Sequence, residues 1–227
     1  MNIMVVAAHP DDEVLGCGGT MATLAKENNV IVAILGEGAT SRDEDQTEAP
    51  DDAVSKLQKE ARSAASILGV SEVVFGGLPD NRFDSRPLLD LIKIVEGWLE
   101  HFQPEVIYTH HGGDLNIDHT QTFRAVLTAT RPMEGHSVRD LYSFEVASST
   151  EWAFQSISPA FVPNTFADIT NAIEQKINAL AAYEGEVRPF PHPRSSDNLR
   201  ATARKWGAAS GFGYAEAFQL IRSIRTA

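Results

Sequence analysis

A single cysteine, Cys17, occurs among the 227 residues of the chain. An internal disulfide framework is therefore excluded, and a reducing compartment is expected. No apolar run approaches the roughly 18 residues that a membrane span needs, and the first residues do not show the charged and then apolar pattern of a secretory signal. Basic residues are also few, with 19 Lys and Arg against 31 Asp and Glu and a net charge of −12, which argues against a binder of nucleic acid or anionic membranes. We expect a cytoplasmic protein that neither binds nucleic acid nor spans a membrane.

The first half of the chain contains a regular alternation of two patterns. Short runs rich in β-branched residues alternate with segments of helical spacing. Strands and helices that alternate at this pace are typical of βαβ units around a parallel sheet. The sequence predicts one α/β domain over residues 1–227, Rossmann-like, with a mostly parallel sheet flanked by helices. The predicted strands are Ile3–Ala8, Val30–Leu35, Glu72–Phe75 and Glu105–Thr109, and the predicted helices are Val14–Glu27, Ala53–Leu68, Pro87–His101 and His119–Ala129.

Beyond Pro132 the alternation is less regular, and no linker rich in Gly, Pro or Ser separates a second domain. Segment 217–224 fits either a strand or a helix. One mobile loop is expected, at the polar and acidic residues 39–52. The later predicted strands are Leu141–Ala147 and Thr165–Ile169, and the later predicted helices are Ile173–Tyr183 and Ser196–Ala208.

Three consecutive acids follow the first predicted strand, in the string "AHPDDE". His9 and Asp12 are three residues apart in a turn that begins with proline, a spacing that can bring both side chains onto one ion. The string "HHGGDLNIDHTQ" follows the fourth predicted strand, and in it Asp118 and His119 begin a helix. Both strings lie at the carboxyl edge of the predicted sheet, where ligands bind. Two histidines and one carboxylate, with a position left for water, are typical of catalytic zinc, and a divalent ion would keep the crowded carboxylates ionised.

Asp11 stands between His9 and Asp12 in the sequence. From this position its carboxylate can accept a proton from a water molecule that the metal activates, which is the role of a general base. His110 and His111 lie at the same edge of the predicted sheet. We assign neither to the metal, because one can line the pocket while the other satisfies backbone groups.

The string "GCGG", with Gly16, Gly18 and Gly19, offers a competing interpretation as a dinucleotide-binding loop. The match fails in detail, because the glycines begin eight residues after the strand rather than at its end. Three acids would also repel a pyrophosphate. Close packing of the first helix against the sheet or a substrate explains these glycines better.

With these strings the chain resembles the PIG-L/LmbE-like family of zinc-dependent N-acetylglucosaminyl deacetylases and related amidases. The resemblance rests on "AHPDDE" after the first strand, on "DH" at the start of a later helix, and on a Rossmann-like order of elements over most of the chain. It implies that His9, Asp12 and His119 bind Zn2+ and that Asp11 is the general base. It also implies a single α/β domain that hydrolyses an N-acetyl group from an amino sugar.

At one position the chain departs from many members of this family. They carry a second histidine three residues before the ligand histidine, where it stabilises the oxyanion, and here that residue is Asn116. Either the amide of Asn116 performs a weaker version of this task, or His192 in "RPFPHPRS" takes it over. In the second case, Asp118 would orient the imidazole of His192.

Substrate contacts are expected in "GLPDNRFD", which follows the third predicted strand. Asp80 can accept hydrogen bonds from sugar hydroxyls, and Asn81 can donate them. The family resemblance points to Asp80 and to Arg62 as substrate contacts. An ion pair on a helix surface is an equally good interpretation of Arg62.

A basic segment stands out against the acidic composition. It can neutralise a phosphate on a sugar nucleotide or a glycolipid head group. It can also be a surface helix balanced by acids, or a contact between the subunits of a homo-oligomer. We expect a small amino-sugar substrate, which in the first case would be phosphorylated or nucleotide-linked. The segment comprises Arg188, Arg194, Arg200, Arg204 and Lys205.

Three functions remain open beside sugar N-deacetylation. The first is an amidase that acts on a thiol conjugate or another small amide. The second is a Rossmann-type protein without hydrolase activity, which binds a nucleotide or S-adenosyl cofactor through "GEGA", Gly36–Ala39. The third is a metal-binding pseudoenzyme, for which Asn116 is the only hint and against which the presence of Asp11 argues.

Overall fold

The first strand, β1 (Asn2–Ala7), is buried on both faces of the sheet. Its alternate residues join two separate apolar clusters, with Val5 in one and Val6 in the other. An apolar run without alternation is typical of a parallel sheet that is covered on both sides. The computed structural model describes residues 1–42, 51–157 and 159–225.

Seven strands form one sheet in the order β3-β2-β1-β4-β5-β7-β6. The first five strands run parallel, and β7 runs antiparallel to both of its neighbours, β5 and β6. The predicted mostly parallel α/β fold is therefore confirmed. The other strands are β2 (Asn29–Gly36), β3 (Glu72–Leu78), β4 (Val106–His110), β5 (Asp140–Phe144), β6 (Thr165–Asp168) and β7 (Ala215–Ser223).

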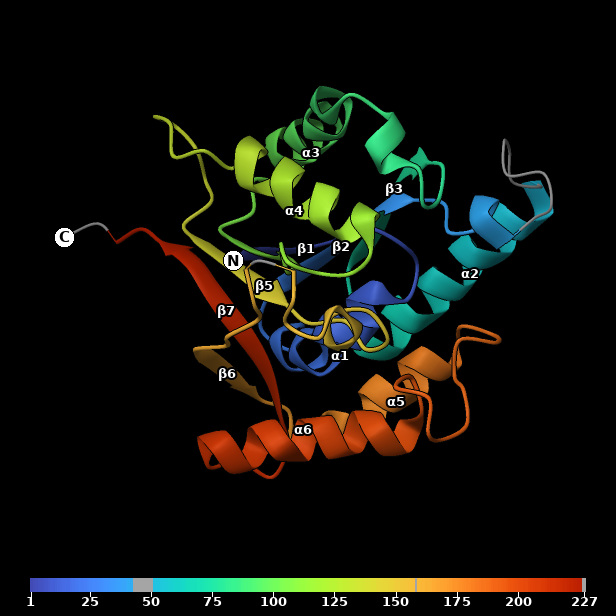
Figure 1. The fold of residues 1–227 in the computed structure, drawn as a ribbon. Helices are drawn as coiled ribbons and strands as arrows, with labels where there is room; N and C mark the ends of the chain where they lie inside the picture. The colour runs from blue at the N-terminus through green and yellow to red at the C-terminus, as the bar shows by residue number, and fades with distance from the viewer. Residues whose placement is uncertain (43–50, 158, 226–227) are drawn as a thin grey trace.

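Helices cover both faces of this sheet, as Figure 1 shows. Two of them, α3 and α4, lie above the sheet in that view, and α1, α2 and α5 lie below it, with α6 beside β6 and β7. We find, among the described residues, no helix with the length and hydrophobicity that a membrane crossing requires. The helices are α1 (Asp12–Leu24), α2 (Asp51–Leu68), α3 (Leu88–Phe102), α4 (Ile117–Ala129), α5 (Ile173–Ala181) and α6 (Ser196–Ser210), with short 3-10 turns at Thr40–Arg42, Phe83–Ser85 and Glu151–Ala153.

The glycines of "GCGG" allow α1 to pack closely against its neighbours. A Cβ atom on Gly16 would overlap the ring of Phe144, and one on Gly19 would come within 2.8 Å of Ile169. Only hydrogen fits at these two positions, so a larger side chain would push the helix away from β5 and from the turn after β6. Packing, as expected, accounts for this string.

The ambiguous segment 217–224 proves to be most of β7, which begins at Ala215. Its neighbours β5 and β6 supply hydrogen-bonding partners on both sides. Of the predicted mobile loop, residues 43–50 lie outside the described residues. The residues on either side form the turn Thr40–Arg42 and the start of α2.

Candidate active site

Most of the predicted site residues gather at the carboxyl edge of the sheet, whereas Arg62 and His192 do not line the pocket there. His9 follows β1, Asp80 follows β3, and Asn116 and His119 follow β4. Together they border a pocket of about 160 Å³. Its lining residues are His9, Pro10, Asp11, Asp12, Gly38, Ser41, Asp80, Asn81, Asn116, His119, Ser148, Ser149 and Arg194.

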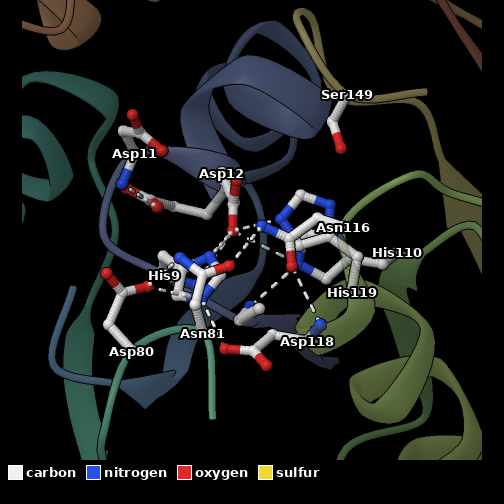
Figure 2. Close-up of polar contacts among 12 residues, drawn as sticks. His9, Asp11, Asp12, Asp80, Asn81, His110, Asn116, Asp118, His119 and Ser149 are labelled. Carbon is white, nitrogen blue, oxygen red and sulfur yellow. Dashed lines mark hydrogen bonds and ion pairs between the residues drawn. The ribbon is translucent and has the colours of Figure 1, made fainter. Parts of the chain in front are cut away.

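Asp12 lies between His9 and His119, as Figure 2 shows. Its Oδ2 atom is 3.3 Å from Nδ1 of His9 and 3.2 Å from Nε2 of His119. The ligand atoms of a tetrahedral zinc ion with bonds of about 2.1 Å stand about 3.4 Å apart. All three side chains are buried, and they offer two nitrogen donors and one carboxylate oxygen. The donor set therefore fits a zinc ion.

The second ring nitrogen of each histidine faces a carboxylate. Nδ1 of His119 is 3.2 Å from Oδ1 of Asp114. Nε2 of His9 is 2.9 Å from Oδ2 of Asp118 and 3.0 Å from Oδ1 of Asp80 (Figure 2). Carboxylates in this position fix the orientation and the tautomer of a metal-binding imidazole. Each imidazole is therefore oriented by a carboxylate on the side away from Asp12. His9 contacts two such carboxylates, from Asp80 after β3 and from Asp118 in α4.

Burial and charge oppose each other in this cluster. Burial would raise the pKa of Asp12, but the imidazoles of His119 and His110 outweigh it and hold that pKa well below its ordinary value. Burial lowers the pKa of His119, whereas the carboxylates of Asp12 and Asp114 raise it to about 9. Asp12 is thus ionised, which is the form that binds a metal.

His110 and His111 both satisfy backbone groups, a role that the sequence suggested for only one of them. Nε2 of His110 accepts a hydrogen bond from the backbone N–H of Ala8 at 2.8 Å. The ring of His110 stacks on that of His119, with the ring centroids 3.9 Å apart. Nε2 of His111 lies 2.7 Å from the carbonyl oxygen of Pro159. In the described part of the chain, neither histidine lines the pocket.

Asp11 occupies the N-cap position of α1 with a φ of 102°, and its side chain makes no capping hydrogen bond. A residue other than glycine in this region of backbone space costs about 1–3 kcal/mol. The backbone N–H of Asp11 donates to Oε2 of Glu13 at 3.0 Å, and the hydroxyl of Tyr183 donates to Oε1 of Glu13 at 2.5 Å. These bonds stabilise the backbone conformation that directs the side chain of Asp11 into the pocket.

The carboxylate of Asp11 pairs with Arg194. Nη1 of Arg194 is 2.6 Å from Oδ2 of Asp11, and Nε of Arg194 donates to Oγ of Ser148 at 2.8 Å. Burial raises the pKa of Asp11 well above its ordinary value, and the guanidinium of Arg194 lowers it. Arg194 therefore favours the ionised form of Asp11, which is the form that accepts a proton.

Asn116 is the N-cap of α4 and also borders the pocket. Its Oδ1 accepts the backbone N–H of Asp118 at 2.8 Å, so the amide oxygen is committed to the helix. Its Nδ2 is left to donate, and it lies 3.3 Å from Oδ1 of Asn81. The capping bond thus fixes the orientation of the Asn116 amide, so that its Nδ2, a hydrogen-bond donor, faces Asn81.

His192 and Asp118 do not form the pair that the sequence suggested. Nδ1 of His192 accepts the backbone N–H of Arg194 at 3.1 Å, and its ring packs edge-on against Trp152. In the part of the chain that the structure describes, His192 is not among the residues lining the pocket. Asp118 instead contacts His9 and accepts the backbone N–H of Phe83 at 3.0 Å. The loop between α5 and α6 instead brings Arg194, two residues after His192, to the pocket.

Arg62 also lies away from the pocket. Its Nη1 donates to the carbonyl oxygen of Val73 at 3.2 Å, and its guanidinium lies 5.2 Å from the centroid of the Phe75 ring. These contacts attach α2 to β3, and Arg62 is not among the described residues that line the pocket. Asp80 and Asn81, in contrast, line the pocket.

The residues of "GEGA", Gly36–Ala39, pack against the turn that carries His9. A Cβ atom on Gly36 would come within 2.8 Å of the carbonyl oxygen of Ala8, and one on Gly38 within 2.8 Å of Pro10. This close approach accounts for both glycines without a nucleotide.

The sequence did not indicate the roles of Asp114 and Arg194. Asp114 lies within the string "HHGGDLNIDHTQ", but no spacing rule connects it with His119, and the hydroxyl of Thr150, 2.6 Å from its Oδ2, also holds it. Arg194 was visible only as part of the basic segment. Of that segment, Arg194 alone lines the pocket, while Arg200 pairs with Glu174 at the surface.

The sequence matches the family model of PIG-L, GlcNAc-PI de-N-acetylase, over residues 4–130. A curated relative, the diacetylchitobiose deacetylase of Thermococcus kodakarensis, is 26% identical over 239 residues, which cover 98% of this chain and 84% of the relative. A 1D-myo-inositol 2-acetamido-2-deoxy-alpha-D-glucopyranoside deacetylase of Mycobacterium sp. (strain JLS) is 25% identical, with 85% of this chain and 76% of the relative covered.

The fold also has solved counterparts. The structure of GalB, the 4-carboxy-2-hydroxymuconate hydratase of Pseudomonas putida KT2440, aligns with a TM-score of 0.77 at 24% identity and covers 100% of this chain and 98% of that one. At this identity the likeness establishes the fold alone. The family match is more specific, because it includes both "AHPDDE" and "DH". The chain belongs to the PIG-L family of de-N-acetylases, hydrolases of an amide C–N bond, as its resemblance to that family predicted.

Proposed function

We propose that the protein is a zinc-dependent hydrolase that removes the N-acetyl group from an N-acetylglucosamine-type amino sugar or its conjugate. The observation that carries this proposal is the coincidence of two features in one pocket. The ligand atoms of His9, Asp12 and His119 face one another there, and the carboxylate of Asp11 borders the same space. Relatives whose names specify acetylated amino sugars support the substrate class.

The chemistry divides between the ion and the chain. A zinc ion held by His9, Asp12 and His119 would supply Lewis acidity and would lower the pKa of a bound water molecule. The carboxylate of Asp11 would accept a proton from the water that attacks the amide carbonyl, and would later give it to the leaving amine. Nδ2 of Asn116 donates a hydrogen bond to the carbonyl oxygen as negative charge develops on it.

The sugar ring is assigned to the side of the pocket that Asp80 and Asn81 form. Asn81 is exposed and lines the pocket, so its amide can meet sugar hydroxyls. Asp80 is buried and already contacts His9. Of these two residues, Asn81 is therefore the better candidate for a substrate contact, and Asp80 for the support of His9.

A phosphate on the substrate gains no support from the basic segment. Arg194 reaches the pocket, but its Nη1 is shared between Asp11 and Glu186, at 2.6 Å from each carboxylate. An amidase that acts on a thiol conjugate or another small amide remains the alternative within the same chemistry. Rates on a panel of acetylated sugars and thiol conjugates distinguish the two substrates.

The proposal is tested by elemental analysis combined with acetate release from N-acetylglucosamine and N,N'-diacetylchitobiose. We expect about one zinc ion per chain, and the loss of both zinc and acetate release in Asp12→Ala. In Asp11→Asn we expect zinc to remain and acetate release to fall about 10²–10⁴-fold. Asp84→Asn, an exposed acid near the same edge, is the control and should keep both.

Two results would overturn the proposal. One is a wild-type protein that resists loading with zinc. The other is full acetate release by Asp11→Asn, since the pocket would then need no base.

A further inference from the structure

A second cavity, of about 300 Å³, lies between α1, α6 and β7. Its wall adjoins the active-site pocket, because Ala147 and Pro193 line the cavity while the next residues, Ser148 and Arg194, line the pocket. It is larger than the pocket of about 160 Å³ that holds the proposed metal ligands. The proposed reaction uses none of its residues.

The apolar part of the cavity comes from α1 and α6. Leu15, Leu199 and Ala203 contribute aliphatic surface, and Trp206 contributes an aromatic side chain. Small-molecule sites combine such walls with a few placed polar groups. The polar groups of this cavity therefore decide which ligand it can take.

One pair of charges in the cavity is already satisfied. Nζ of Lys176 is 2.5 Å from Oε1 of Glu216 and donates to the carbonyl oxygen of Leu15 at 2.7 Å. Glu216 also accepts the backbone N–H groups of Gly19 and Thr20, at 3.0 and 2.7 Å. This pair fastens α1 and α5 to β7, and it offers little to a ligand.

Glu145 is only partly satisfied. Its Oε1 accepts the indole N–H of Trp206 at 2.6 Å, while its Oε2 makes no hydrogen bond within the described part of the chain. Burial raises the pKa of this carboxyl group above its ordinary value. Glu151 also lines the cavity. Among the described residues that line the cavity, Lys205 is the cation outside the pair of Lys176 and Glu216, and its Nζ lies 4.0 Å from the centroid of the Trp206 ring.

The charge of the cavity therefore favours a cationic ligand. With Lys176 and Glu216 neutralising each other, two carboxylates face one ammonium group, and one negative charge remains. An ammonium ion of a ligand would form a charge-assisted hydrogen bond with Oε2 of Glu145, which burial makes stronger than one in water.

We infer that this cavity is a second ligand site, which binds a small organic ammonium ion. The ammonium group pairs with Glu145, and the body of the ligand packs against Trp206, Leu199 and Ala203. The inference stands apart from the proposed deacetylation, because it needs neither zinc nor acetate release.

The indole N–H resonance of Trp206 in a nitrogen-15 NMR spectrum reports directly on this site, because that group donates to Glu145. The spectrum of Trp206→Phe assigns the resonance. Cyclohexylammonium is the probe, and cyclohexanol is its neutral counterpart. We expect cyclohexylammonium to shift the resonance saturably, with cyclohexanol at least about tenfold weaker.

Glu145→Gln is the decisive variant, because its amide oxygen still accepts the indole N–H while its amide nitrogen faces the ligand. It should weaken cyclohexylammonium binding at least about tenfold, and Glu72→Gln, an exposed acid on β3, should not. Thr202→Phe, which fills the cavity from the half-buried face of α6, should also prevent binding. Equal binding of the two probes, unchanged binding in Glu145→Gln, or no saturable shift in the wild type would overturn the inference.

Discussion

Arg194 and Asp11 form an ion pair at 2.6 Å across 183 positions of the sequence. The same Nη1 atom lies 2.6 Å from Oε2 of Glu186. The guanidinium group of Arg194 thus forms ion pairs with the candidate base, Asp11, and with Glu186 at the same time. Its charge opposes the effect of burial, which raises the pKa of Asp11.

Replacing Arg194 should therefore change the pH dependence of the reaction. In Arg194→Gln the pKa of Asp11 rises further, so a higher pH is needed to ionise the base. We expect the acidic limb of the pH profile of kcat/KM to move upward by about one unit or more. Arg200→Gln, which loses a surface pair with Glu174, should leave the profile in place. An unmoved acidic limb in Arg194→Gln would show that Arg194 does not control the base.

Asn116 and His192 can be separated as candidates for stabilising the oxyanion. Asn116→Asp keeps the oxygen that caps α4 but removes the N–H donor. We expect turnover to fall about 10²–10³-fold with little change in melting temperature. His192→Asn keeps an acceptor for the backbone N–H of Arg194 and should retain near wild-type turnover. The reverse ranking of the two variants would return the role to His192.

Glu13 should make the stability of the fold depend on pH. Burial raises the pKa of Glu13 from 4.5 to about 7. Between pH 4.5 and about pH 7, Glu13 is ionised in the unfolded chain but still protonated in the folded one. The free energy of unfolding therefore falls as the pH rises through this range, by up to about 3 kcal/mol, and stays at the lower value above about pH 7.

Urea unfolding at about pH 5 and about pH 8 measures this effect. In Glu13→Gln the fall between the two pH values should shrink by the contribution of this one group. The exposed variant Glu72→Gln should show the same fall as the wild type. If Glu13→Gln also matched the wild type, Glu13 would titrate normally in the folded protein.

Two glycines in helices should respond to alanine in opposite directions. Gly16→Ala places a methyl group against the ring of Phe144 and should lower the free energy of unfolding by about 1–3 kcal/mol. Gly97→Ala, in α3 with nothing within 4 Å of the added carbon, should raise it by about 0.5–1 kcal/mol. Urea unfolding of both variants gives the comparison, and destabilisation by Gly97→Ala would contradict the account of α3.

The first half of the fold and the candidate metal ligands could be predicted because both depend on local rules. Continuous apolar runs predict buried parallel strands, and the ends of such strands meet at one edge. His9 and His119 therefore come together, with their ring centroids 5.5 Å apart, although 110 positions separate them in the sequence. The antiparallel insertion of β7 could not be predicted in this way, since its neighbours are chosen by tertiary pairing.

The identity of the side chain that enters the pocket from the last third of the chain could not be predicted either. His192 and Arg194 are two residues apart in a loop rich in proline. Arg194 is held in the pocket by contacts with Ser148 and Glu186, which are 46 and 8 positions away in the sequence. No local pattern shows that these contacts favour Arg194 over His192 as the neighbour of Asp11. The position of Arg62 could not be predicted for a related reason, because it depends on how α2 packs against β3.

The pair between Asp11 and Arg194 divides the active site between two stretches of the chain. Residues 4–130, which match the family model, contain the three ligand candidates and Asp11, whereas the guanidinium comes from a loop beyond them. Substitutions in that loop can retune when Asp11 ionises without touching a single ligand. The pH at which the candidate base ionises therefore depends in part on a surface loop, the kind of segment that tolerates substitution best.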